Sequence, residues 1–299
     1  MLFSMRGGEK TMWILFSIFT VIFWAGSDFF CKKGTLESKE LNHLKITINI
    51  GLIMGIFSVI YMFLNRTFIS FENIVRYLPV SFFYILSMIL GFIGLKYIEL
   101  SISSPICNAS CFITTLLCFF ILKQDITFIK FIAVVVIVVS IIGIAVSIPK
   151  ESKGEVKYDR HFIAIIFPIL YCLLDGIGSF LDATVLVSGM SEVEVNIAYN
   201  TTFFIFAIFC YVYLALVKKI KYNPFSEKEF TKGAICETLG QATYVFAMAS
   251  NAIIASPFIA TYSVFSVILS RIFLKEKLTK TQYVLITFVI CAMFILSIE

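Results

Sequence analysis

Long apolar runs cover most of this 299-residue chain, and their length decides the solvent in which it can fold. An α-helix needs roughly 20 apolar residues to cross a bilayer core of about 30 Å. Ten runs approach that length: about 13–31, 45–64, 76–97, 101–122, 128–148, 162–184, 194–217, 231–250, 253–274 and 281–298. The sequence therefore predicts an all-α integral membrane protein with ten transmembrane helices.

The composition agrees with a chain whose main partner is the lipid bilayer. Hydrophobic residues make up 60% of the sequence and charged residues 14%, with a mean hydropathy of +0.96. Soluble domains are about half apolar and a quarter charged, and a soluble fold this apolar would expose large sticky patches. The basic residues lie between the apolar runs without the interleaved aromatics of a nucleic-acid surface. The eight cysteines lie in or beside the runs with no histidine near them, so we expect no metal site.

One polar stretch, PKESKGEVKYDR at 149–160, divides the chain into two halves of five runs each. Its composition is typical of a linker. The expected organisation is an N-terminal tail at 1–12, a first five-helix repeat at 13–148, the linker, and a second five-helix repeat at 161–299.

The two halves carry the same residues at matching positions, which indicates an internal repeat. A shift of 152 positions superposes Ser104-Pro105 on Ser256-Pro257, Leu122-Lys123 on Leu274-Lys275, and Thr127 on Thr279. A shift of 147 superposes Asp28 on Asp175. Because five is an odd number of crossings, the halves must traverse the membrane in opposite senses. Such inverted repeats are a common plan of secondary transporters, with the substrate site between the repeats near the midplane.

The segment from Phe273 to Leu296, FLKEKLTKTQYVLITFVICAMFIL, resembles the end of a repeat in EamA-type transporters of the drug/metabolite transporter superfamily. That pattern is a Leu-x-Glu-x-Leu-Thr turn followed by a final apolar helix. The turn glutamate is Glu276 in the second half and is replaced by Gln124 in the first, and Tyr97 lies at the family's distance before Gln124.

The resemblance extends over essentially the whole chain, and Trp24 near the end of the first run also suits it. It implies export or exchange of small organic metabolites, amino acids or drugs across the cell membrane. The family's mid-helix proline is absent from the fourth helix. Pro105 and Pro257 are instead expected in the first turns of their helices, where a missing N–H costs little.

Three acids in the predicted spans are candidate pathway residues: Asp28, Asp175 and Glu237. A charge at the centre of a spanning helix costs roughly 2.5–3.5 kcal/mol on insertion scales, so such residues usually face a cavity or a partner. Asp28 has the alternative of pairing with Lys32 four residues later, Asp175 of a structural hydrogen bond, and Glu237 of reaching the interface. Burial disfavours the charged form of a carboxyl group, which makes protons a candidate coupling ion.

Uncharged polar residues complete the predicted substrate pathway. Gln241 and Tyr244 share a helical face with Glu237, Asn196 and Asn200 share one in the seventh run, and Tyr262 and Ser266 share one in the ninth. Helix packing is their alternative role. The predicted pathway comprises Trp24, Asp28, Asp175, Asn200, Glu237, Gln241, Tyr244 and Tyr262. Gly51 and Gly55 have the Gly-x-x-x-Gly spacing of helix packing, within a monomer or between two monomers.

These features favour a secondary transporter of small organic solutes that works by alternating access. We expect no enzymatic activity, catalytic residue or cofactor, and no Gly-x-x-x-x-Gly-Lys-Ser/Thr motif for ATP occurs. A lipid-intermediate flippase of the same superfamily is the alternative. An intramembrane aspartyl protease using Asp28 and Asp175 is disfavoured, because Asp175-Gly176-Ile177-Gly178 reverses the Gly-x-Gly-Asp order of that class.

The sequence leaves the orientation and the oligomeric state, monomer or homodimer, open. Of the 24 Lys and Arg residues, 18 are predicted on the side that holds the linker. The positive-inside rule then assigns both termini to the outside of the cell membrane, whereas the family resemblance implies that they lie inside.

Overall fold

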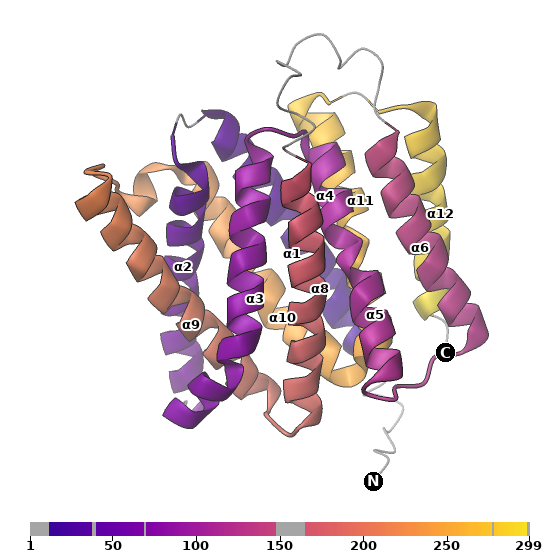
Figure 1. Ribbon diagram of the computed structural model, residues 1–299, viewed down its shortest axis with the longest axis horizontal. Coiled ribbons are helices and arrows are strands. Elements are labelled where there is room, and N and C mark those ends of the chain that lie inside the picture. The colour runs from indigo at the N-terminus through magenta and orange to yellow at the C-terminus, as the bar shows by residue number, and fades with distance from the viewer. Residues whose placement is uncertain (1–11, 38–39, 69, 148–164, 277, 298–299) are drawn as a thin grey trace.

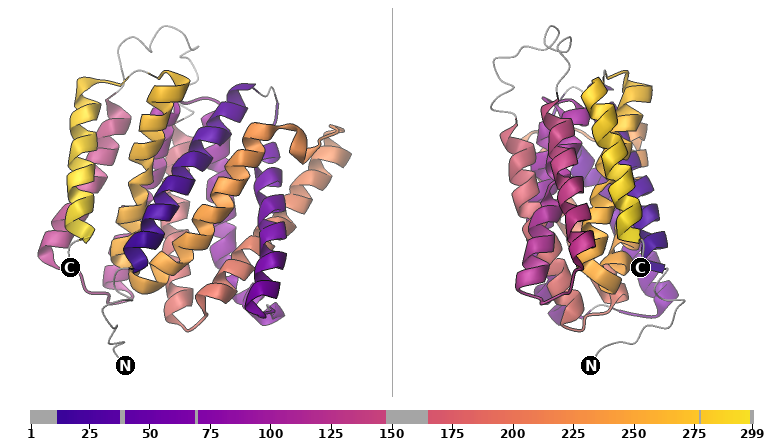
Figure 2. Two further views of the ribbon diagram at one scale, coloured as in Figure 1. Left: turned by 180° about the vertical axis from the view of Figure 1, so that it is seen from behind. Right: turned by 90° about the vertical axis from the view of Figure 1, so that its right-hand side faces the viewer.

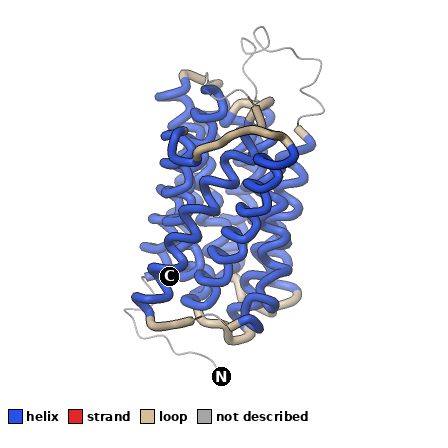
Figure 3. Tube along the Cα trace, turned by 90° about the vertical axis from the view of Figure 1, so that its left-hand side faces the viewer, coloured by secondary structure: helices blue, strands red, loops and turns tan. Residues whose placement is uncertain are grey.

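A computed structural model describes residues 12–37, 40–68, 70–147, 165–276 and 278–297. The predicted linker at 149–160, and the predicted tail except for its last residue, lie outside the described residues. The described ranges form a bundle of helices and contain no strand. The helix axes run roughly side by side (Figures 1 and 3).

The helices follow the apolar runs closely. They are α1 (Met12–Glu37), α2 (Asn42–Asn65), α3 (Phe71–Leu95), α4 (Leu100–Asn108), α5 (Ser110–Phe120), α6 (Phe128–Val146), α8 (Ile166–Val187), α9 (Glu192–Val212), α10 (Lys228–Ala260), α11 (Tyr262–Leu269) and α12 (Lys280–Ser297). A π-helical turn extends α9 through Tyr213–Val217 and another extends α11 through Ser270–Leu274.

Seven helical stretches in the described ranges are long and apolar enough to cross a membrane: Met12–Glu37, Asn42–Asn65, Phe71–Leu95, Leu100–Phe120, Ile166–Val187, Glu192–Val217 and Lys228–Leu274. The last spans 47 residues and contains two of the ten predicted spans. Two more predicted spans fall in the shorter apolar helices Phe128–Ile144 and Lys280–Leu296. Large apolar side chains such as Phe63, Phe82 and Phe294 face outward. Since lipid is the solvent that such a surface fits, the fold is that of a multi-pass membrane protein.

Three backbone breaks interrupt these apolar stretches. Asn251 has non-helical φ −165° and ψ 88° inside α10. The second part of α10 reverses direction and leads to α11 (Figure 2). Ala109 separates α4 from α5, and Thr261 separates α10 from α11.

The breaks at Ala109 and Thr261 each follow a proline by four residues, and these prolines correct one expectation. Pro105 and Pro257 lie inside their helices, beyond the first turn. A proline there removes one backbone hydrogen bond and its ring clashes with the preceding turn, which bends or breaks a helix. The carbonyl of Ile253, which Pro257 leaves without its helical donor, accepts from the Thr115 hydroxyl at 3.5 Å.

The extensive helix contacts join the first half of the chain to the second. α1 packs along α10 and α3 along α8, while α2 pairs with α9 and α6 with α12. Hydroxyl groups link some of these pairs, as with Thr20 and Thr243 at 2.8 Å between α1 and α10. Such interhelical hydrogen bonds stabilise helices in lipid, where hydrophobic attraction between them is weak.

The two glycines of the Gly-x-x-x-Gly spacing bring α2 against α9 within the same chain. A Cβ atom on Gly51 would lie 2.2 Å from the Cβ atom of Ala207 and 2.8 Å from the carbonyl oxygen of Phe203. One on Gly55 would lie 2.5 Å from the ring of Phe204. The close approach therefore depends on the missing side chains.

Gly51→Ala is expected to lower the free energy of unfolding by about 1–3 kcal/mol, because a backbone carbonyl blocks the added methyl group. Thermal unfolding in detergent measures the change. Gly94→Ala is the matched control, since its Cβ atom would meet nothing closer than Phe167 at 3.4 Å. Equal stability of the two variants would contradict this packing.

Candidate functional site

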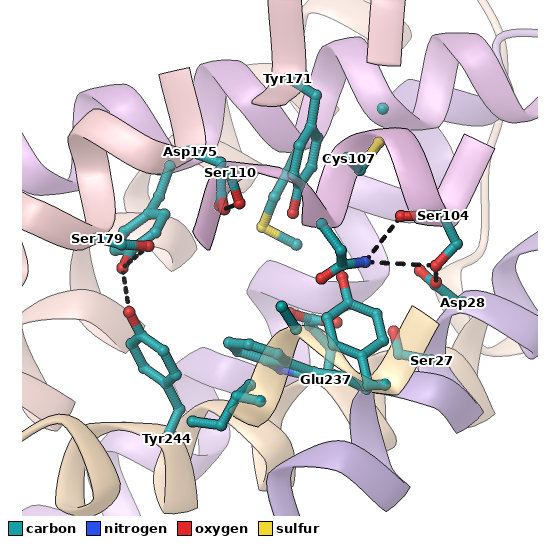
Figure 4. Close-up of a pocket in the computed structure, with 18 of the residues that line it drawn as sticks. Ser27, Asp28, Ser104, Cys107, Ser110, Tyr171, Asp175, Ser179, Glu237 and Tyr244 are labelled. Atoms are coloured by element: carbon teal, nitrogen blue, oxygen red, sulfur yellow. Dashed lines mark hydrogen bonds between the residues drawn. The ribbon is translucent and has the colours of Figure 1, made fainter. Parts of the chain in front are cut away.

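A cavity lies between the two halves and is lined by side chains of both (Figure 4). Its walls come from α1, α3, α4, α5 and α8–α11. The cavity volume is ≈ 80 Å³, on a measure by which one water needs about 10–15 Å³. Several waters, or the polar part of a small solute, therefore fit inside.

The three acids predicted from the sequence all border this cavity. Asp28 accepts hydrogen bonds from Ser104 at 2.5 Å and Ser266 at 2.9 Å. Asp175 accepts one from Ser110 at 2.7 Å (Figure 4). Each acid thus has hydroxyl donors from other helices, as the cost of an isolated carboxylate in a bilayer requires.

Glu237 lies in α10 beside Ser27 of α1. Its side chain is on the cavity wall, which is the location expected of a pathway residue, and its transport role stays a prediction. Ser27 and Asp28 are adjacent in α1, so this one helix brings a hydroxyl to Glu237 and a carboxyl group to the serines of α4 and α11.

Lys32 does not pair with Asp28. Its ammonium group is buried and donates to the carbonyl oxygens of Leu95 at 2.6 Å and Ile98 at 2.7 Å. These carbonyls lie at the end of α3, where a cation complements the negative end of the helix dipole. The lysine therefore closes a helix end and leaves Asp28 to the cavity.

Aromatic side chains form much of the remaining wall. The hydroxyl of Tyr84 lies 2.8 Å from that of Tyr244 and donates to Ser179 at 3.1 Å. The indole of Trp24 packs on the rings of Tyr244 and Tyr262, with ring centroids 5.0 and 5.5 Å apart.

Two neutral N–H donors on this wall have no hydrogen-bond partner among the residues that the structure describes. Both the indole N–H of Trp24 and the side-chain NH₂ of Gln241 are buried and unpaired, and both residues line the cavity. Because an unsatisfied buried donor costs roughly 1–3 kcal/mol, these two groups favour an occupant that accepts hydrogen bonds.

Seven of the eight predicted pathway residues meet around this cavity: Trp24, Asp28, Asp175, Glu237, Gln241, Tyr244 and Tyr262. Asn200 is not among the lining residues. It is fully buried in α9, where its amide donates to the carbonyl of Asn196 at 2.6 Å. That contact fits the packing alternative, and the transport role of the other seven stays a prediction.

Sequence reasoning missed several polar lining residues. Tyr171 and Ser179 flank Asp175 at four-residue spacing in α8, so the i, i+4 pattern could have identified them. Tyr84 and Tyr199 gave no such signal, because single tyrosines in apolar helices are common. Asp182 was also missed, and it lies outside the cavity, fully buried, accepting from the Tyr77 hydroxyl at 2.7 Å.

The turn residues at the ends of the two halves cap helices of the opposite half. The Glu276 carboxylate accepts from the backbone N–H groups of Leu100 at 3.2 Å and Ser101 at 3.0 Å, at the start of α4. The Gln124 side-chain oxygen accepts from the N–H of Ile253 at 3.1 Å, just after the break at Asn251. Both contacts satisfy N–H groups that a helix start leaves unpaired.

Comparison with known proteins agrees with this geometry. Residues 11–146 match the EamA-like transporter family. The matched segment contains Trp24, Asp28 and the broken α4–α5 pair, so this part of the chain is similar to an EamA-type transporter. The match confirms the resemblance drawn from the sequence over residues 11–146, and it supports a membrane transporter of the drug/metabolite transporter superfamily.

No curated protein matches the chain. Among solved structures 28 chains match. One, described as "Crystal structure of protein", superposes with a TM-score of 0.68 over 97% of this chain and 96% of its own, at 10% sequence identity. That likeness shows a shared fold over nearly the full length.

Glu276→Ala is expected to lower the free energy of unfolding by about 0.5–2 kcal/mol, the usual cost of losing a helix cap. Glu276→Gln is the matched control, because it reproduces the amide oxygen of Gln124 and keeps one acceptor. Thermal unfolding in detergent would show the order wild type, glutamine, alanine. An alanine variant as stable as the wild type would exclude a capping role.

Proposed function

We propose that the protein is a secondary transporter of small organic solutes in the cell membrane, with two inverted five-helix repeats that open the central cavity to each side in turn. The observation that carries the proposal is the cavity itself. Side chains of both halves line it, and Asp28, Asp175 and Glu237 are among them. Substrate sites between inverted repeats are the usual arrangement in such carriers.

The helix pairing supports the two-repeat organisation. In this organisation α1 corresponds to α8, α2 to α9, α3 to the first part of α10, and α6 to α12. Exchanging the two halves then turns the α1–α10 contact into the α8–α3 contact. The same exchange leaves the α2–α9 and α6–α12 pairs unchanged. A pseudo-two-fold axis would produce this pattern.

The backbone breaks support the same correspondence. The shift of 152 positions found in the sequence superposes Ala109 on Thr261. These two residues separate α4 from α5 and α10 from α11, next to the cavity wall. It also superposes Gln124 on Glu276. Discontinuous helices at the substrate site are a recurring feature of secondary transporters.

The reciprocal caps provide a physical basis for alternation. The capped starts of α4 and of the second part of α10 lie at opposite ends of the bundle (Figures 1 and 2). Rocking one half against the other would break the capping hydrogen bonds at one end of the bundle while those at the other end stay formed. Since the two caps are similar in chemistry, the two closed ends would be similar in free energy, as an alternating carrier needs.

Flux measurements in proteoliposomes test this proposal. Purified protein is expected to carry members of a panel of amino acids, nucleobases and organic cations, and to exchange external for internal labelled solute faster than empty vesicles. A pH dye inside the vesicles tests protons as the coupling ion, because solute entry would then change the internal pH. No flux over the whole panel would contradict the proposed function, and flux without a pH change would exclude proton coupling.

A further inference from the structure

The charges around the cavity are all of one sign. Asp28, Asp175 and Glu237 are on its wall, and no Lys, Arg or His is among the lining residues that the structure describes. Lys32, one residue beyond the cavity-lining Cys31, has its ammonium group committed to the carbonyls of Leu95 and Ile98. A buried carboxyl group in a low-dielectric site either takes up a proton or is stabilised as a carboxylate by a nearby positive charge, and the described lining residues supply no such charge.

The acids also keep acceptor capacity for an occupant. A carboxylate offers about four lone-pair sites. Asp28 uses two of them on Ser104 and Ser266, and Asp175 uses two on Ser110 and Tyr171. Because the serines are neutral, they orient the carboxyl groups without balancing their charge.

The aromatic wall suits the same kind of occupant. The rings that line the cavity are those of Trp24, Tyr84, Phe92, Tyr171, Tyr199, Tyr244 and Tyr262. The face of an aromatic ring attracts a cation by up to about 2 kcal/mol or more when water is excluded, with Trp the best and Tyr next. The same faces repel an anion.

The unpaired N–H groups of Trp24 and Gln241 add a second recognition element. Both groups are neutral donors, and Gln241 is 2% exposed. They match a neutral acceptor such as a hydroxyl or carbonyl oxygen on the solute. Two neutral donors would not offset the repulsion of three acids toward a carboxylate or phosphate.

We propose that the cavity selects small organic cations, amines or quaternary ammonium compounds that carry a neutral hydrogen-bond acceptor. This inference rests on the proposed transport function and specifies its substrate class. The acids hold the cationic group, the aromatic rings surround it, and Trp24 with Gln241 binds the acceptor end.

Three compounds of matched shape test the charge requirement: choline, its neutral carbon analogue 3,3-dimethyl-1-butanol, and the anion 3,3-dimethylbutanoate. Binding is read from the fluorescence of Trp24 in a Trp13→Phe background, which removes the only other tryptophan. Choline is expected to change the emission in a saturable way, and the neutral and anionic analogues are expected to bind at least about tenfold more weakly. Labelled choline is then followed in the proteoliposome exchange assay.

Asp175→Asn and Glu237→Gln keep the shape of the wall and remove one acid each, and each is expected to weaken choline binding by about tenfold or more. Asp125→Asn removes an acid from an exposed loop and is the control for net charge. Equal binding of the three compounds, or unchanged choline binding in both cavity variants, would overturn the inference. If other members of the panel are carried while none of the three compounds binds, the cation preference fails and the transport function stands. If nothing is carried, the transport function itself fails.

Discussion

The cost of a carboxyl group in the bilayer is the constraint on which the rest of this structure depends. Asp28, Asp175 and Glu237 belong to three helices that are otherwise almost wholly apolar, and none could face lipid cheaply. They are satisfied by turning inward to serines of neighbouring helices and to a shared hollow. The hollow lies among α1, α8 and α10, which carry these acids, at the boundary between the two halves.

The same boundary accounts for the broken helices. Pro105 and Pro257 interrupt the ladder of their helices, and the breaks at Ala109 and Thr261 border Ser110 and Tyr262 on the cavity wall. Irregular backbone is tolerated at membrane depth only where it is covered by protein or lines a cavity. Placing both breaks beside the polar hollow meets that condition.

The sequence was sufficient to locate the helices because apolar runs of bilayer length leave few other structures possible. It was also sufficient to select residues most of which line one cavity, since charged residues and i, i+4 polar pairs in such runs avoid lipid. The sequence could not show that Gln241 lines the cavity while Asn200 is buried in α9 away from it, because both amides lie in apolar runs at the same i, i+4 spacing. Tyr84 and the true position of Pro105 were missed for a related reason, since each depends on how one helix packs against another rather than on a pattern within one helix.

The direct test of the central claim, that the two halves open the cavity alternately, is a pair of distance measurements in the reconstituted protein. Spin labels at Tyr97 and Lys275 span the end closed by Glu276, and labels at Asp125 and Ser250 span the end closed by Gln124. Alternating access predicts two distances for each pair of labels, one for the closed end and one for the open end. When solute is added, the population with the longer distance should grow at one end while the population with the shorter distance grows at the other. A single unchanging distance at both ends, or both ends lengthening together, would contradict it.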